Sequence, residues 1–384
     1  MRKPDPFPPL ASCGYRFRGL LRSASTARAT ELEDTPRRIL IVIAAGIGDF
    51  VMATPALGAI REHFPQASIW ILTIPEAKPL VERCPHVNVI RTLDLRRSRS
   101  ALTWAVGHRR QELWQLIREL RKTQFDFALN LYAIETLGGA LRIAAAFWLI
   151  GARRTLGRWS GGYGFAYDLR SKQEGHEIDA QLGVVRLMGI TPRTELPELW
   201  VTLEDEVACA LLLKTHGVSS AEKLACLHPG SARPEACWPG NRFVVVGQHL
   251  AAAGARVVII GALGQQPLCK SLAEPIPGAI SLAGATSLPV LAALLQRATL
   301  LVTNDSGPMH MAAALGTPVV VPFGPATPDR FGPRGRAGCF LFTGSQRTRG
   351  SHWWEGVSAA TVAEAATGVF VEASGGLGAP TRQS

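Results

Sequence analysis

The stretch "TNDSGPMHMAAALGTPVVVPFG", residues 303–324, joins a polar turn to a run of small residues with helical spacing. Pro308 suits the first turn of a helix, so the N–H groups of Ser306, Gly307 and Met309 are expected to point toward an anion. The helix dipole adds partial positive charge at the same place. These residue types and their spacing predict a phosphate-binding turn.

Asp305 and His310 add a second chemistry to this turn. A carboxylate repels phosphate, so Asp305 is better suited to the hydroxyl groups of a sugar. His310 lies on the following helix, where it can contact the same ligand. The alternative is structural: Asp305 caps the helix, and His310 is a core histidine with its hydrogen bonds satisfied.

A second loop, "HPGSAR" at residues 228–233, follows another expected strand. Ser231, the backbone N–H groups and Arg233 are suitable donors to phosphate oxygens. The alternative is an ordinary strand-to-helix loop with an arginine that faces solvent.

A third loop, Gly46-Ile47-Gly48-Asp49, follows the first apolar run of the chain. Glycines allow a sharp turn and a close approach of the backbone to a ligand. Asp49 is expected at a helix N-terminus, either as a general base or as an N-cap. The loop is neither a Walker A sequence nor a complete G-x-G-x-x-G fingerprint, because Met52 stands at the third glycine position.

Strands alternating with helices must position these loops. Continuous apolar runs such as "RILIVIAA", residues 38–45, are typical of strands buried on both faces of a parallel sheet. The alternation predicts an α/β fold of two Rossmann-like domains, each with a doubly wound parallel sheet. Ligands of such sheets bind beyond the carboxyl ends of the strands, where all three loops lie. Further strands, with their turns, are expected at 68–74, 87–93, 125–132, 223–231, 255–262, 298–307 and 317–324, and helices at 50–64, 113–120, 183–190, 242–253 and 288–297.

Three details of these elements are also expected. Pro55 is placed near the first turn of the helix at 50–64, and Thr286 and Ser287 are candidate caps of a later helix. The most apolar internal stretch, residues 137–152, is too short to span a bilayer and contains Arg142. A buried helix is the preferred interpretation there, and a helix that contacts a membrane is the alternative.

Charge is distributed unevenly along the 384 residues, whose net charge is +11. Residues 1–200 hold 28 basic and 19 acidic side chains, so the first half carries nearly all of the excess. Such a field favours an anionic partner, and the alternative is a solvated basic face that aids solubility. The seven cysteines include no CxxC pair, which predicts neither a disulfide framework nor a zinc site and fits a reducing cytoplasm.

Composition also suggests the domain organisation. We expect a basic, disordered arm over residues 1–36, a first domain over 37–200, a second domain over 201–350, and a helix with a flexible tail over 351–384. The boundary is placed near residues 194–206, where "TELPELWVTLEDE" changes the composition. A transit peptide is the alternative interpretation of the arm.

The three loops, in this order, resemble glycosyltransferase family 9, the ADP-heptose:lipopolysaccharide heptosyltransferases. The resemblance covers residues 37–369, and the G-x-G-D opening with T-P-A-L is specific when combined with the D-S-G-P-M-H box. It implies a GT-B architecture, in which the first domain binds the acceptor and the second binds a nucleotide sugar. The matching segments are "RILIVIAAGIGDFVMATPALGAIREHFPQASIWILT", "CLHPGSARPEACWPGNRFVVVGQHLAAAGARVVIIGA" and "LVTNDSGPMHMAAALGTPVVVPFGPATP".

The resemblance also implies an activity: metal-independent, inverting transfer of a heptose or related sugar from an ADP-sugar to an anionic lipopolysaccharide core-type acceptor, without a cofactor. Asp49 matches the catalytic base. A cytoplasmic location is expected, with peripheral association with the inner face of the cytoplasmic membrane. Nucleic acid is not an expected partner, since no nucleic-acid-binding motif is found. The donor side comprises Ser231, Arg233, Gln265, Asp305, Ser306, Gly307 and His310, and the acceptor side Gly46, Gly48, Arg96, Arg97 and Arg109.

Two positions depart from the pattern of the family. Its members carry Lys or Arg just before the tryptophan of a W-P pair, where it contacts phosphate, whereas Glu-Ala-Cys at residues 235–237 precedes Trp238 here. Arg233 can replace that cation if its loop is shifted. No acid follows "VVIIG" to bind ribose hydroxyls, and Gln265 is a weak substitute. Two alternatives stay open: a glycosyltransferase of this fold that uses another nucleotide sugar, and a catalytically impaired nucleotide-sugar-binding protein.

Overall fold

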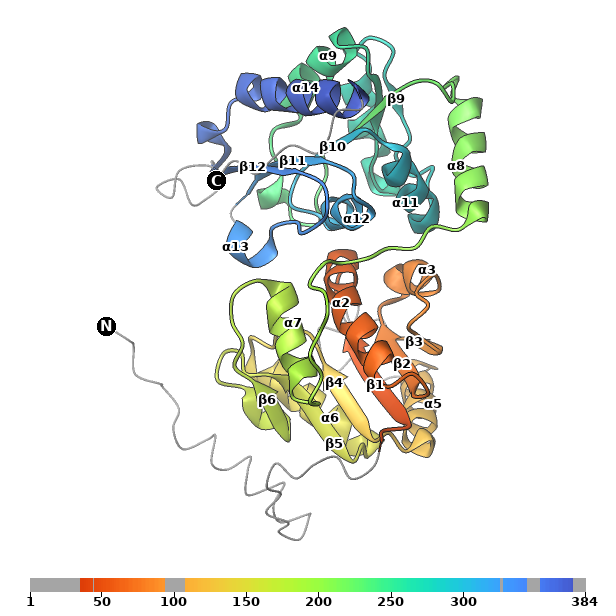
Figure 1. Ribbon diagram of the computed structural model, residues 1–384, viewed down its shortest axis with the longest axis vertical. Helices are drawn as coiled ribbons and strands as arrows, with labels where there is room; N and C mark the ends of the chain where they lie inside the picture. The colour runs from red at the N-terminus through yellow and green to blue at the C-terminus, as the bar shows by residue number, and fades with distance from the viewer. Residues whose placement is uncertain (1–34, 44, 94–107, 325–326, 344–352, 376–384) are drawn as a thin grey trace, which may run out of the picture.

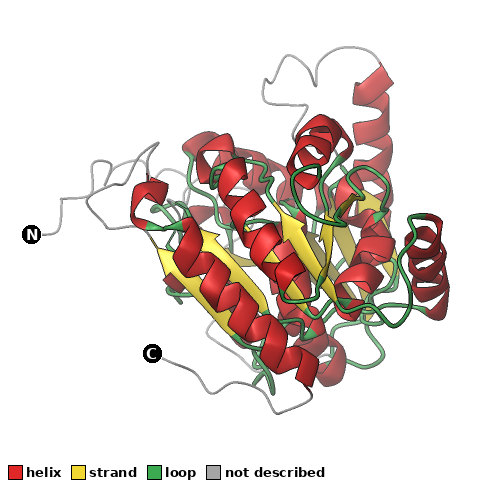
Figure 2. Ribbon diagram, turned by 90° about the horizontal axis from the view of Figure 1, so that it is seen from above, coloured by secondary structure: helices red, strands yellow, loops and turns green. Residues whose placement is uncertain are grey.

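The computed structural model describes residues 35–43, 45–93, 108–324, 327–343 and 353–375. Two parallel six-stranded sheets, each covered by helices on both faces, form two units that are stacked along the long axis of the molecule (Figures 1 and 2). This is the expected pair of Rossmann-like units. The N-terminal arm expected over residues 1–36 lies almost entirely outside the described residues.

The first sheet has the strand order β3-β2-β1-β4-β5-β6, with every neighbouring pair parallel. Its central strand β1 pairs Ile39 with Ile69 of β2 and with Phe127 of β4. The chain reverses direction across the sheet between β3 and β4, which opens a crevice at the carboxyl end of β1. The strands are β1 (Arg38–Ile43), β2 (Ser68–Thr73), β3 (Val89–Thr92), β4 (Phe127–Asn130), β5 (Arg154–Arg158) and β6 (Leu169–Ser171).

The second sheet repeats this topology in the order β12-β11-β10-β7-β8-β9. Here β7 and β10 are the central neighbours, with Cys226 opposite Leu301. The loops after these two strands therefore lie at the corresponding crevice. The strands are β7 (Leu224–His228), β8 (Arg256–Ile259), β9 (Ile280–Ser281), β10 (Leu300–Thr303), β11 (Val319–Phe323) and β12 (Cys339–Thr343).

Alternate residues of β1 pack into separate cores, because neighbouring side chains of a strand point to opposite faces. Ile39 and Ile41 join a core that continues into the second domain, whereas Leu40 and Val42 pack under α5 and α6. The helices that accompany the first sheet are α2 (Ile47–His63), α3 (Lys78–Val81), α5 (His108–Thr123), α6 (Leu137–Ile150) and α7 (Glu177–Arg186), with 3₁₀ turns at Pro75–Ala77 and Gly164–Ala166.

The second sheet has its own helical layers, and α14 packs on α9 over one face of it. The expected C-terminal helix thus belongs to the second domain's packing. The helices are α8 (Leu203–Thr215), α9 (Gly240–Ala252), α10 (Gln266–Ala273), α11 (Leu288–Arg297), α12 (Gly307–Leu315), α13 (Pro328–Phe331) and α14 (Ala359–Gly375), with 3₁₀ turns at Pro234–Ala236, Leu263–Gln265 and Trp353–Gly356. The proposed boundary within residues 194–206 lies between α7 and the first turn of α8, and it stays a prediction.

Helix α2 differs from its predicted form, because it begins three residues earlier and holds Pro55 in its middle. A proline lacks an N–H and leaves the carbonyl four residues earlier without its helical partner. That carbonyl belongs to Val51, and the Thr54 hydroxyl donates to it at 2.8 Å. The neighbouring threonine therefore makes the proline tolerable.

In α11 the predicted bounds are confirmed, with Ser287 as the cap that accepts from the Val290 N–H.

The preferred interpretation of residues 137–152 as a buried helix is wrong. In α6 only Ala140, Phe147 and Ile150 are buried, and they point into the core beneath the helix. The opposite face is exposed, and it carries large apolar side chains such as Leu141 and Trp148 together with Arg142. Among the described residues, no helix is long and apolar enough to cross a membrane.

Candidate active site

The N-terminal ends of α2 and α12 meet between the two sheets (Figure 1). A Cβ atom added to Gly48 would lie 2.7 Å from Cδ2 of His310, and one added to Gly307 would lie 3.3 Å from Cβ of Ile47. Only glycine at position 48 allows the two helix ends to approach this closely. The loop at 46–49 and the turn at 303–307 are thereby brought into one site.

Asp49 lies in the third position of α2, with Gly46 as the N-cap residue. Its Oδ2 accepts a hydrogen bond from the Gly46 N–H at 2.7 Å, and the side chain is half-buried. The alternative that Asp49 is itself the N-cap is therefore wrong, because Gly46 occupies that position. The Asp49 carboxylate nevertheless accepts a backbone hydrogen bond at this helix end. This bond fixes the carboxylate at the edge of the site.

The turn that opens α12 has Ser306 as N-cap, without a capping bond from its side chain. The alternative of Asp305 as the cap is therefore wrong. Among the described residues, the N–H groups of Ser306 and Gly307 have no hydrogen-bond acceptor. The expectation fails for Met309, whose N–H donates to the Ser306 carbonyl at 3.2 Å. Two backbone donors thus remain for an anion at this helix end.

The hydroxyl of Ser306 points into the protein. It lies 3.1 Å from Nδ1 of His228 and 3.0 Å from Oγ1 of Thr303. Burial lowers the pKa of His228 to about 4, so its imidazole is neutral at pH 7. The Ser306 side chain therefore holds the turn in place, and only the backbone N–H of Ser306 is available to a ligand.

Asn304 joins the turn to the 228–238 segment and was missed in the sequence. It is fully buried; its Oδ1 accepts from the Trp238 N–H at 2.9 Å, and its Nδ2 donates to the Pro229 carbonyl at 2.7 Å. A buried amide must find such partners, so the residue fixes the relative positions of the loop at 228–233 and the turn at 303–307. These two segments, which are predicted to bind the sugar donor, are called the donor loops below. The available signal was a polar residue directly after an apolar strand.

Arg233 and Asp305 form an ion pair across the two donor loops, with Nη2 and Oδ2 2.8 Å apart. Ser231 lies behind this pair and donates through Oγ to the Asp305 carbonyl at 3.2 Å. Burial raises the pKa of the Asp305 carboxyl, and Arg233 opposes that shift. The guanidinium of Arg233 is half-exposed and lies beside the turn at 303–307.

The segment before Trp238 is built without a cation. Residues 234–236 form a 3₁₀ turn with Ala236 buried, and the Trp238 ring is buried against Phe243. Arg233, at the start of that turn, supplies the positive charge next to Asp305. That Arg233 replaces the missing Lys or Arg of the family at the phosphates stays a prediction.

Gln265 reaches the same edge of the second sheet. Its Oε1 accepts from the Ala262 N–H at 2.9 Å, and its amide group covers Gly230 so closely that a Cβ there would lie 2.1 Å from Nε2. Glycine at 230 is therefore required by this contact. Gln265 consequently lies beside the 228–233 loop, on the side away from α2.

His310 is buried where the two domains meet. Its pKa is lowered to about 4, first by burial and further by the nearby His176. The ring is neutral at pH 7 and packs against Gly48. The ring lies at the contact between the two helix ends, against the residue that precedes Asp49. A role for His310 in binding the donor stays a prediction.

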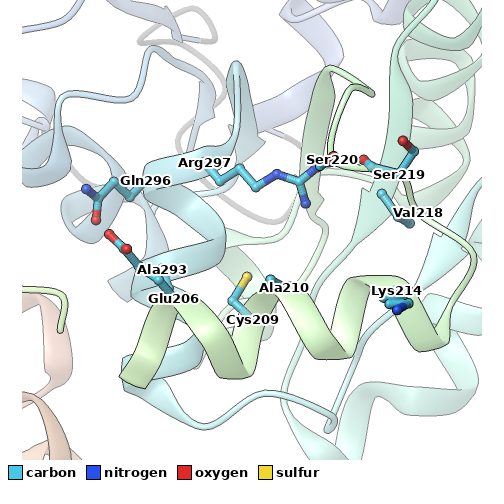
Figure 3. Close-up of a pocket in the computed structure, with 10 residues that line it drawn as sticks. All are labelled: Glu206, Cys209, Ala210, Lys214, Val218, Ser219, Ser220, Ala293, Gln296 and Arg297. Atoms are coloured by element: carbon cyan, nitrogen blue, oxygen red, sulfur yellow. Dashed lines mark hydrogen bonds between the residues drawn. The ribbon is translucent and has the colours of Figure 1, made fainter. Parts of the chain in front are cut away.

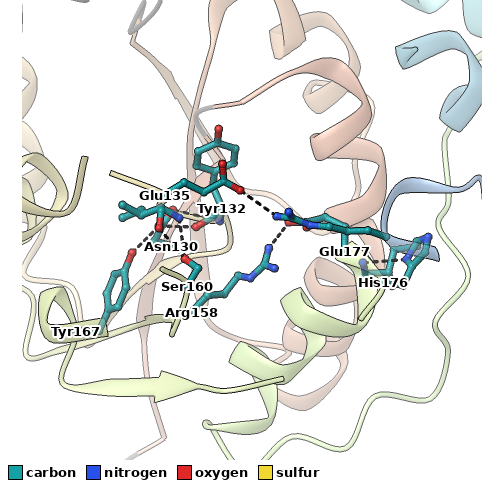
Figure 4. Close-up of polar contacts among 11 residues, drawn as sticks. Asn130, Tyr132, Glu135, Arg158, Ser160, Tyr167, His176 and Glu177 are labelled. Atoms are coloured by element: carbon teal, nitrogen blue, oxygen red, sulfur yellow. Dashed lines mark hydrogen bonds and ion pairs between the residues drawn. The ribbon is translucent and has the colours of Figure 1, made fainter. Parts of the chain in front are cut away.

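A network of charged residues beside Asp49 was not predicted. Arg158 and Glu177 form a buried ion pair (Figure 4). Arg330 of the second domain lies 3.6 Å from Glu177 and 3.3 Å from Glu135. Tyr132 lies among them, its pKa raised by burial and then by Asp49 and the two glutamates. No motif marks Arg330, whose partners are far away in the sequence.

The remaining acceptor-side predictions are only partly placed. Gly46 and Gly48 lie at the contact described above. Arg96 and Arg97 lie outside the described residues, and Arg109 belongs to α5, although its side chain is not described. Helix α5 covers the face of the first sheet opposite α2 and α7.

A cavity of about 690 Å³ lies elsewhere, between α8 and α11 (Figure 3). Cys209, Lys214, Ser219 and Arg297 line it, and none of the predicted site residues does. The predicted catalytic and binding residues converge instead at the facing helix ends and loops, away from this cavity.

A family model described as glycosyltransferase family 9 (heptosyltransferase) matches residues 113–346, more than half of the chain. The chain belongs to this family. It is a glycosyltransferase, and the matched region includes every predicted donor-side residue. The loop at 46–49 lies outside the matched region, so the role of Asp49 stays a prediction.

Two bacterial heptosyltransferases are similar to this chain over most of its length. Lipopolysaccharide heptosyltransferase 2 of Salmonella typhimurium (strain LT2) is 28% identical over 311 residues, 76% of this chain and 84% of the relative. Lipopolysaccharide heptosyltransferase 3 of Escherichia coli is 24% identical over 294 residues, 72% of this chain and 80% of the relative.

Solved structures share the two-domain fold. The glycosyltransferase of family 9 from Veillonella parvula superposes with a TM-score of 0.73 at 22% identity, covering 91% of this chain and 100% of that one. Escherichia coli ADP-heptose lipopolysaccharide heptosyltransferase II superposes with a TM-score of 0.70 at 22% identity, covering 87% and 99%. The predicted GT-B architecture is confirmed.

Proposed function

We propose that this glycosyltransferase moves a heptose from ADP-heptose to a lipopolysaccharide core-type acceptor, with inversion at the anomeric carbon. One observation carries the proposal: the helix end that holds Asp49 packs directly on the helix end that offers two backbone donors, at the contact of Gly48 with His310. A base and a site for a diphosphate leaving group thus face each other. The names of the relatives support the sugar and the acceptor.

In this reaction the Asp49 carboxylate takes the proton of the acceptor hydroxyl. The oxygen forms a bond to the anomeric carbon as the bond from that carbon to the diphosphate oxygen breaks, and the electron pair leaves with ADP. The N–H groups of Ser306 and Gly307 and the dipole of α12 stabilise the charge that develops on the leaving group. Arg233 binds the same phosphates by turning from Asp305, which is then available to sugar hydroxyls.

The direct test is an assay with ADP-heptose and a deacylated, water-soluble core acceptor, in which ADP release and product mass are measured. Asp49→Asn is the sharpest variant, because the amide oxygen can still accept from the Gly46 N–H. A general base contributes about 10²–10⁴-fold, so kcat is expected to fall by that factor with ADP affinity unchanged. Full turnover by Asp49→Asn would remove Asp49 from this role.

Two alternatives have observations in their favour. The first is a glycosyltransferase that uses another nucleotide sugar, which is favoured by Gln265 in place of an acid near the 228–233 loop. Calorimetric titration with ADP, UDP and GDP identifies the nucleotide that is bound selectively. The uncharged residues 236 and 237 favour an impaired protein that binds a nucleotide sugar without transferring it. In that case wild type and Asp49→Asn bind ADP equally, and neither releases ADP above background.

We also propose that the protein works in the cytoplasm, at the inner face of the cytoplasmic membrane, where its glycolipid acceptor is held. The excess of basic residues in the first half of the chain supports an anionic partner there. Comparison of soluble and membrane fractions of cells at low and high salt tests this location. Recovery in the soluble fraction at both salt concentrations would contradict it.

A further inference from the structure

Helix α6 presents an apolar stripe to solvent. Leu137, Leu141 and Trp148 are 46%, 55% and 60% exposed, and their spacing of four and seven residues places them on one face of the helix. The opposite face is fixed in the core by Phe147. A soluble protein gains nothing by leaving large apolar side chains in a row on its surface, so such a stripe indicates an interaction site.

Helix α5 runs beside α6 on the same face of the first sheet and supplies positive charge. Arg121 donates from Nη1 to the Leu149 carbonyl of α6 at 3.0 Å, which ties the two helices together. Trp114, 46% exposed, stands four residues before the exposed Arg118, and Lys122 follows at the same spacing. We call the surface made by Trp114, Arg118, Lys122, Leu137, Leu141 and Trp148 the α5–α6 face.

This face begins at the candidate active site. Thr136 caps α6 by accepting from the Gly139 N–H at 3.1 Å, and the residue before it, Glu135, pairs with Arg330 of the second domain. Leu137 therefore stands at the end of the face closest to the network around Asp49. A molecule whose sugar lies in the cleft can extend its remaining part along the stripe.

A second helix has an exposed apolar stripe with different charges, and the contrast identifies the occupant. On α8, Leu203, Val207 and Leu211 are exposed, but the acidic Glu204 and Glu206 lie between them. An anionic surface is repelled by α8 and attracted to the α5–α6 face. Tryptophan also favours the boundary between water and lipid, and long basic side chains extend toward headgroups from an apolar surface.

We propose that the α5–α6 face docks on an anionic membrane surface, with its tryptophans and leucines at the headgroup boundary and its cations on the lipid phosphates. The docking places the Leu137 end of the face, and with it the cleft, next to the membrane. This inference rests on the proposed function, because a glycolipid acceptor supplies the reason for a membrane contact.

The test is flotation of the full chain with vesicles of equal parts phosphatidylglycerol and phosphatidylethanolamine, and separately with phosphatidylcholine vesicles. Wild type is expected to bind the anionic vesicles at least tenfold more strongly. The pair Leu141→Ser and Trp148→Ser lowers binding on the order of tenfold. The pair Arg118→Gln and Lys122→Gln lowers it about fivefold for each cation, and only on the anionic vesicles. The matched control, Leu203→Ser with Leu211→Ser on α8, leaves binding within twofold of wild type.

Equal loss of binding in the α8 control, or no binding of wild type to anionic vesicles, overturns the proposal. So does sedimentation of wild type as a dimer that the Leu141→Ser and Trp148→Ser pair converts to a monomer, because a second copy then occupies the face. Turnover on the deacylated acceptor separates the two ideas. Retained turnover without vesicle binding refutes the docking surface alone, and selective vesicle binding without turnover supports the docking surface while refuting the proposed function.

Discussion

Replacement of Asn304 by alanine is expected to destabilise the second domain and weaken donor binding together. The side chain is completely buried; it accepts from the Trp238 N–H at 2.9 Å and donates to the carbonyls of Pro229 at 2.7 Å and Gly230 at 3.4 Å. Alanine leaves this donor and these acceptors without partners in a site that water does not reach. Each unsatisfied group costs about 1–3 kcal/mol, so the free energy of unfolding falls by about 3 kcal/mol or more.

The assay is urea unfolding followed by tryptophan fluorescence, with hydrogen exchange of the peptide around Trp238 as a local readout. The Trp238 amide loses its acceptor, so its protection falls along with the global stability. ADP affinity is expected to fall on the order of tenfold, because the two donor loops are no longer held in register. Asn241→Ala, at an exposed position on α9, is the matched control and changes stability by about 0.5 kcal/mol or less. An Asn304→Ala protein as stable as this control would refute the reasoning.

Three further outcomes follow from the site. Gly48→Ala puts a Cβ 2.7 Å from His310, so the two helix ends must move apart and kcat is expected to fall at least tenfold. Circular dichroism is expected to show that the protein stays folded. An unchanged kcat would show that activity does not require contact between the helix ends. Arg233→Gln removes the cation beside Asp305, and calorimetry is expected to show ADP binding weakened by about tenfold or more. Equal binding by the variant and the wild type would show that Arg233 does not bind the phosphates of the donor. His228 and His310 have pKa values lowered to about 4, so both bind protons more readily when unfolded. The contribution of each of these histidines to stability is therefore full above pH 6.5 and falls by roughly 1.4 kcal/mol per pH unit as the pH drops toward 4. Urea unfolding at several pH values checks the slope, which should be smaller by about 1.4 kcal/mol per pH unit in His228→Gln.

Local sequence patterns were sufficient to predict most of the strands and helices. Residues 39–43 are apolar and buried at every position, a composition typical of a strand covered on both faces. Glycine turns after such strands marked both helix ends of the site. One error also had a local cause. The helix continues through Pro55 because the Thr54 hydroxyl replaces the missing N–H donor, and the general preference of proline for the first helical turn does not predict this.

Sequence patterns did not predict which apolar faces are buried or which charged residues pair across the domains. The apolar stretch of α6 was expected to be buried, yet Leu141 and Trp148 are exposed, because apolarity alone does not say which face has a neighbour. Arg330 gave no signal at all. Its partners Glu135 and Glu177 come from the other domain, and an ion pair across such a separation exists only once both domains are packed.

The sequence by itself determined the alternation of strands and helices, the family, and the three loops that can hold a base and a phosphate. Those features depend on local periodicity and on glycines whose freedom is a property of the residue. Tertiary structure decided which loops share a site: His310 meets Gly48 across the domains, and Asn304 holds Trp238 beside the donor turn. The physical reason is that packing and buried hydrogen bonds act between residues distant in the chain, and their partners are set by the fold as a whole.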